Sequence, residues 1–208
     1  HRSGHSAGEL SRVDRHVRRL STTGPLDRRR RRRRAPRPTA APQVANGGGE
    51  IVVLEAASFS INQTLRLRAS DKPDTEVQGR LIPNYLGPLV IAPDFINGWL
   101  PSLQDIILRG SLRDGNNLNF QNTVRAISSH IDLSTATEDY PGRLDHDNAG
   151  VASTALFANS GNYVFVALET NRQVAVVDAY SKRELFRLDV GRAPQGLVLA
   201  PDGLTLFV

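Results

Sequence analysis

The chain has 208 residues, a formal net charge of +5 at pH 7 and no Cys. The absence of Cys excludes disulfides, thiolate metal sites, a thiol nucleophile and CxxCH haem attachment within these residues. No apolar run approaches the ~20 residues that a membrane-spanning helix needs, and no signal peptide is recognisable.

The charge is concentrated in an N-terminal tail. Residues 1–45 carry a net charge of +10, including seven consecutive arginines at Arg28–Arg34, whereas the remainder carries −5. Residues 1–46 contain almost no large apolar side chains, so they are predicted to be a disordered Arg/Pro/Ala-rich tail. The tail is either an RNA- or phosphate-binding arm, a solvated linker, or the product of a misassigned reading frame in a GC-rich genome. No aromatic residues separate the arginines, which favours the linker and argues against a nucleic-acid partner.

The rest of the chain shows a repeat of short strands. From residue 47 onward, runs of Val, Leu, Ile and Phe alternate with Gly, Asn, Asp and Pro, as in short antiparallel strands joined by tight turns. The turn Asn159–Gly161 and the strand Tyr163–Val166 return 42 residues later as Pro201–Gly203 and Leu204–Val208. A period of about 40 to 45 residues with four strands is typical of a β-propeller blade.

The repeat divides the chain into blades. The sequence predicts an all-β fold, a partial β-propeller of about three blade equivalents of four-stranded antiparallel sheet over residues 47–208. In chain order we expect a half blade (47–68), a blade with a long insertion (86–144), a regular blade (151–190) and a half blade (193–208). Because a propeller closes with about four to eight blades, we also expect the protein to continue beyond Val208.

Loops at one face of the predicted propeller are the candidate ligand-binding region. Connections between second and third strands, and between successive blades, emerge on the same face, and loops on a rigid scaffold commonly carry function. The polar residues of two such connections are the candidates, namely Arg109, Arg113, Asp114 and Asn116 in the long insertion and Asp145, His146, Asp147 and Asn148 before the regular blade.

The segment Asp145–Asn148 allows two interpretations. Carboxylate and imidazole groups suit a divalent cation, whereas Asp and Asn side chains also accept hydrogen bonds from backbone N–H groups in a polar turn. Successive side chains on an extended segment point to opposite faces, which favours the turn, so no metal site is predicted.

Residues on the predicted second and third strands carry no recognisable catalytic motif. Ser128 and Ser129 have no neighbouring base and acid in a recognisable nucleophile motif, so no catalytic residue is predicted. His130 is expected to be a partly exposed strand residue. Trp99, with Phe95 nearby, would either line a sugar-stacking site or fill the space between blades, and packing is the commoner role.

Several segments resemble a known repeat family. Tyr163–Ala167 (YVFVA), Gln173–Asp178 (QVAVVD) and Ala193–Gly196 with Ala200–Gly203 resemble the YVTN family of bacterial and archaeal β-propeller repeats. The resemblance implies a secreted or periplasmic protein with a binding role. We therefore expect a noncatalytic binding or interaction module, whose partners are a protein or small-molecule ligand on the propeller face and the remaining blades of the same chain.

A second resemblance supplies an alternative function. The segments 82–94, 109–115 and 122–133 look like bacterial secreted proteins in which a propeller precedes a c-type cytochrome domain of the di-haem peroxidase kind. On that alternative the chain is the propeller half of a periplasmic redox protein. The resemblance would place haem c in a downstream domain, since these 208 residues contain no CxxCH and are expected to hold no cofactor.

Overall fold

The computed structural model describes residues 42–45, 49–71, 81–105, 115, 117–118 and 123–208. All of these belong to one compact unit, Pro38–Val208. The remainder of the predicted tail, residues 1–41, lies outside the described residues. No helix in the described ranges has the length and apolar character needed to cross a membrane.

The most regular sheet, here called sheet C, is formed by the predicted regular blade. Its four strands are antiparallel and lie in chain order: β10 (Ala152–Phe157), β11 (Tyr163–Leu168), β12 (Gln173–Asp178) and β13 (Arg183–Asp189). A 3-10 helix, η2 (Glu169–Asn171), connects β11 to β12. The central strands are rich in β-branched residues and are buried on both faces, as their continuous apolar runs predict. The predicted all-β fold of antiparallel four-stranded sheet is confirmed.

The preceding sheet, sheet B, has two long central strands and two interrupted outer positions. The central strands are β6 (Asn97–Asp105) and β7 (Val124–Asp132). Both β4 (Ile82–Asn84) and β5 (Val90–Ile91) pair with β6, and both β8 (Thr137–Glu138) and β9 (Leu144–His146) pair with β7. The 3-10 helix η1 (Tyr140–Gly142) separates β8 from β9. Its central residue, Pro141, has no backbone N–H to donate to a ladder, so the outer strand is interrupted there.

Two smaller sheets flank these. Sheet A contains β1 (Pro42–Ala45), β2 (Glu50–Leu54) and β3 (Ile61–Arg66), and sheet D contains β14 (Val198–Leu199) and β15 (Leu206–Phe207). The predicted tail extends too far, because its residues Pro42–Ala45 pair with β2. Strand pairing uses backbone groups, and Pro is tolerated as the first residue of a strand, so small and proline-containing segments can still join a sheet edge.

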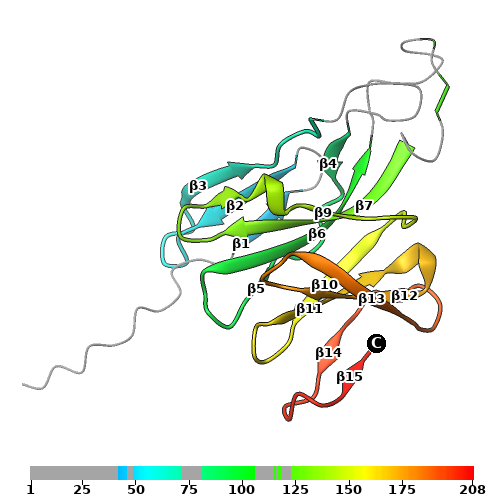
Figure 1. Cartoon of the computed structure of the whole chain (residues 1–208). Helices are drawn as coiled ribbons and strands as arrows, with labels where there is room; N and C mark the ends of the chain where they lie inside the picture. Colours follow the sequence, from blue (N-terminus) through cyan, green and yellow to red (C-terminus); the bar gives the residue numbers. More distant parts are fainter. Residues whose placement is uncertain (1–41, 46–48, 72–80, 106–114, 116, 119–122) are drawn as a thin grey trace, which may run out of the picture. The chain divides into compact units, whose positions relative to one another are not determined.

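The sheets are stacked, with sheet B between sheets A and C (Figure 1). One apolar cluster, which includes Trp99, Ala126, Val164 and Val177, fills the space between sheets B and C. A second cluster between sheets A and B includes Ile51, Leu65, Leu100 and Ile131. Neighbouring residues of the same strand enter different clusters because successive side chains of a strand point to opposite faces.

Gly87 lies where sheets B and C approach closely. A Cβ atom at Gly87 would be 2.8 Å from the carbonyl oxygen of Ser153 and 3.0 Å from that of Pro101. We therefore expect Gly87→Ala to lower the free energy of unfolding by about 1–3 kcal/mol, the usual cost of overpacking. Gly191, which has no atom within 4 Å of such a Cβ, is the matched control. Urea denaturation should show a change within about 0.5 kcal/mol for Gly191→Ala. Equal effects of the two substitutions would contradict this packing.

Candidate functional site

The predicted candidates at positions 145–148 are divided between a strand and a turn. Asp145 and His146 belong to β9, where they pair with Ile127 and Ala126, so the expected loop begins two residues too early. Asp147 and Asn148 form the turn. The backbone oxygen of Asn148 accepts a hydrogen bond from the Asn171 side chain at 2.6 Å. The blade-to-blade connection and the β11–β12 connection therefore meet at one end of the sheets, as predicted.

His146 is fully buried and joins sheet B to sheet C. Its Nδ1 lies 2.9 Å from Glu184 Oε2, and its Nε2 lies 2.7 Å from the Ser128 hydroxyl. Because a carboxylate only accepts, Nδ1 carries a proton, and in a neutral ring Nε2 then accepts from the Ser128 hydroxyl. Burial alone would raise the pKa of Glu184, but hydrogen bonds from His146 and Arg187 lower it below its ordinary value. The carboxylate therefore stays ionised and fixes the imidazole tautomer.

A β-bulge allows β13 to contribute to this chain of hydrogen bonds. The register between β12 and β13 shifts between Val176 and Val177, so that Val177 faces Glu184 and Ala175 faces Arg187. Two residues three positions apart on a regular strand would lie on opposite faces, whereas the bulge places Glu184 and Arg187 on the same face. Arg187 Nε donates to Glu184 Oε1 at 2.5 Å, and Arg187 Nη2 donates to the Asp147 backbone oxygen at 2.9 Å.

Ser128, His146 and Glu184 have the connectivity of a nucleophile, base and orienting acid. The sequence shows no such motif around Ser128, because the base and the acid lie 18 and 56 positions further along the chain. Both Ser128 and His146 have 0% of their surface exposed. A nucleophile must reach its substrate, and this hydroxyl has no contact with solvent. The arrangement therefore acts as a buried polar joint between two sheets.

Arg125 binds both carboxylates of the candidate segment. Its Nη2 lies 2.9 Å from Asp145 Oδ1 and 2.9 Å from Asp147 Oδ1. Burial would lower the pKa of Arg125, but the hydrogen bonds and charges of the two aspartates raise it above its ordinary value. In the described ranges, no group of three or more His, Cys, Asp and Glu side chains is placed to hold a metal ion. The candidates in the long insertion, Arg109, Arg113, Asp114 and Asn116, lie outside the described residues.

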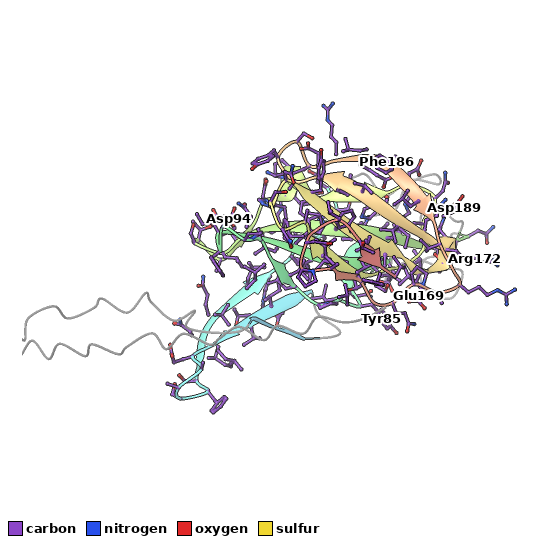
Figure 2. The ribbon with its side chains drawn as sticks, turned by 90° about the horizontal axis from the view of Figure 1, so that it is seen from below. Tyr85, Asp94, Glu169, Arg172, Phe186 and Asp189 are labelled. Carbon is purple, nitrogen blue, oxygen red and sulfur yellow. The ribbon has the colours of Figure 1, made fainter. Side chains whose placement is uncertain are left out.

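A cavity of about 250 Å³ opens at the other end of sheets B and C. Its walls are the β5–β6, β10–β11 and β12–β13 turns together with the end of β7. Figure 2 shows Asp94 of the β5–β6 turn at the end opposite to Glu169 and Arg172 of the β11–β12 connection. This cavity was not predicted, because sequence reasoning placed the site on the loops at the Glu169 end.

The polar wall of the cavity is a chain of hydrogen bonds centred on His130. Asp94 accepts from the backbone N–H groups of Ile96 and Asn97, and its Oδ2 accepts from Asn97 Nδ2 at 2.5 Å. Because that bond fixes the amide orientation, Asn97 Oδ1 accepts from His130 Nε2, at 2.8 Å. The other ring nitrogen lies 3.2 Å from Asp139 Oδ2, which also binds Lys182 Nζ.

Burial and two neighbouring charges affect the pKa of His130. Its surface is 7% exposed, so the expectation of a partly exposed residue is wrong. Burial lowers the pKa of His130 and the charge of Lys182 lowers it further, against the opposing effect of Asp139. The pKa of Asp139 is held below its ordinary value chiefly by the hydrogen bond from Lys182. Burial and the Lys182 ammonium therefore disfavour protonation of the imidazole, whereas the Asp139 carboxylate favours it.

Trp99 forms the floor of this region. It is 0% exposed and belongs to the core cluster between sheets B and C, so its packing role is confirmed and its ring face is closed to sugar stacking. Its indole Nε1 is buried and has no hydrogen-bond acceptor within the part of the chain that the structure describes. Phe95 is 73% exposed, on the turn above.

The lowered pKa of His130 predicts a pH-dependent stability. The unfolded chain gains a proton at this residue near the ordinary histidine pKa, about 6.5, whereas the folded chain does so only at lower pH. The free energy of unfolding should therefore fall as pH decreases from 7.5 to 5. Urea denaturation should show a smaller fall for His130→Gln over the same range. An unchanged slope would contradict the lowered pKa.

Comparisons with known proteins find similar solved structures and no matching family. No family model and no curated protein matches it. Solved structures that are similar include the hydrazine synthase of Kuenenia stuttgartiensis (TM-score 0.48, 11% identity, covering 78% of this chain and 62% of that one). The dihydro-heme d1 dehydrogenase NirN has a TM-score of 0.45 and 17% identity, and the match covers 76% of this chain and 26% of that one. The periplasmic gluconolactonase PpgL of Pseudomonas aeruginosa has a TM-score of 0.45 and 14% identity, and the match covers 77% of this chain and 42% of that one.

The chain spans less than two thirds of the length of each of these three proteins. The chain is structurally similar to these β-propeller proteins over part of their length. At these identities the likeness concerns the fold alone.

Proposed function

We propose that the chain is a noncatalytic binding module of a secreted or periplasmic protein, and that it receives a small polar ligand in the cavity between the turns of sheets B and C. The cavity supports this proposal because it combines an open space of about 250 Å³ with ordered polar side chains. The buried Ser128 hydroxyl, in contrast, offers no reacting group to solvent. The extracytoplasmic location rests on the sequence resemblance to the YVTN family.

The scaffold suits recognition of a small molecule. Typical ligand pockets measure about 300–1,000 Å³, so this cavity, at about 250 Å³, is slightly smaller than that range. A volume of about 250 Å³ corresponds to roughly eight waters at their share of liquid volume. Strands joined by buried hydrogen bonds hold Asn97 and His130, and this reduces the entropy lost when a ligand binds.

The outer face of sheet C supports the proposed protein partner, another blade-like sheet. Phe186 and Leu188 are 54% and 45% exposed there, beside the buried Val174 and Val176 to which they are paired. The connection between β13 and β14 contacts sheet C, because Ser153 Oγ donates to the Pro194 backbone oxygen at 2.9 Å. Exposed contiguous apolar side chains of this kind mark an interaction surface.

The binding role can be tested with the single tryptophan of the chain, Trp99, as a fluorescent reporter in the cavity wall. Wild-type protein is titrated with sodium propionate, propylammonium chloride, propionamide and glycerol. We expect a saturable change for at least one of them. Ser160→Phe should abolish it, because Ser160 is exposed and lines the cavity that the larger side chain would fill.

Ser58→Phe is the matched control, since Ser58 is an exposed residue of the β2–β3 turn and does not line the cavity. It should bind like wild type. The proposal fails if none of the four solutes gives a saturable change, or if the Ser160→Phe protein binds as well as the Ser58→Phe protein.

A further inference from the structure

The hydrogen-bonding groups of the cavity are unequally used. Both oxygens of Asp94 accept N–H bonds from their own turn, and both polar atoms of the Asn97 amide are paired. Each of these acceptors therefore has a donor already. A ligand that enters the cavity meets acceptors whose bonds are made within the protein.

Donors, in contrast, remain available. The indole N–H of Trp99 has no acceptor among the described residues. The Lys182 ammonium has three N–H bonds, and Asp139 is its one hydrogen-bond partner in the described part of the chain. Among the described residues that line the cavity, Lys182 is also the one Lys or Arg side chain. A buried donor without an acceptor is destabilising, so an acceptor supplied by a ligand would recover that lost free energy.

Part of the cavity wall is apolar. Ala92, Pro93, Phe157 and Ala179 line the cavity together with the polar residues. Together with the small volume, these side chains favour a short hydrocarbon group attached to the polar part of the ligand.

We propose that the ligand of this cavity is a short-chain carboxylate, whose oxygens accept hydrogen bonds from Lys182 and from the indole N–H of Trp99. This inference rests on the binding role proposed above and adds the chemical class of the ligand. The carboxylate completes the bonding of the two donors, and its alkyl chain lies against the apolar wall. Asp94 does not compete for these donors, because its oxygens are turned onto the backbone and side-chain N–H groups of its own turn.

The experiment compares propionate with propionamide at pH 7 and constant ionic strength. Propionamide has nearly the same shape without the negative charge. We expect propionate to give a saturable change in Trp99 fluorescence and to bind more tightly than propionamide. Lys182→Gln should weaken propionate binding about tenfold or more, as loss of a charge-assisted hydrogen bond predicts. Arg183→Gln, which removes the exposed charge of the next residue, at the start of β13 and outside the cavity wall, should bind within about twofold of wild type.

Trp99→Phe provides an independent arm in which Lys182 is intact. Line broadening of the propionate methyl signal in proton NMR replaces fluorescence for this variant, and we expect binding to weaken several-fold. Unchanged melting temperatures will show that the variants remain folded, and Lys182→Arg should retain most of the affinity if Lys182→Gln is unstable.

Equal affinity for propionate and propionamide, or an unaltered affinity in Lys182→Gln, would overturn the carboxylate assignment. If glycerol or propylammonium binds instead and Ser160→Phe abolishes that binding, the binding role stands and the carboxylate assignment alone fails.

Discussion

The alternation of side chains along β7 is the constraint on which the stacking of the sheets depends. Ser128 faces sheet C, where its hydroxyl bonds to His146, which in turn bonds to Glu184. Ser129 points to the other face, where its hydroxyl donates to Glu138 Oε1 at 2.8 Å. Glu138 also accepts from the Arg68 backbone N–H beyond β3, at 3.0 Å. Two consecutive residues of β7, Ser128 and Ser129, therefore begin hydrogen-bond chains that lead toward the two neighbouring sheets.

These bonds specify the arrangement more than they add net stability. A buried hydrogen bond contributes about 0.5–1.5 kcal/mol, whereas an unpaired buried group costs about 1–3 kcal/mol. Burial of Trp99, Leu100 and the other core residues supplies the main driving force, and the polar partners select one register among similar apolar packings. The same register places His130, two residues after Ser128 and on the same face, beside the turns of sheet C that form the cavity.

The strands were largely predictable from the sequence, and the site was not. The strands of residues 151–190 follow from local alternation and turn residues, which need no knowledge of distant contacts. The strand Pro42–Ala45 was missed because its composition resembles a linker and its pairing with β2 is tertiary. The relation of Ser128 to His146 and Glu184 depends on sheet stacking and on a bulge in β13. The polar wall of the cavity depends on the hydrogen bond from Lys182 to Asp139, which are 43 residues apart. No spacing pattern in the sequence predicts that this pair is in contact.

A double-mutant cycle tests the joint between sheets B and C most directly. Ser128→Ala and Glu184→Ala remove the two ends of a chain that passes through His146, and the two side chains are not hydrogen-bonded to each other. Urea denaturation should give a coupling free energy of more than about 0.5 kcal/mol for this pair, whereas Ser129→Ala with Glu184→Ala should be additive. Additive effects for Ser128 and Glu184, or equal coupling for both serines, would contradict the account of β7 as a strand that fastens each face to a different sheet.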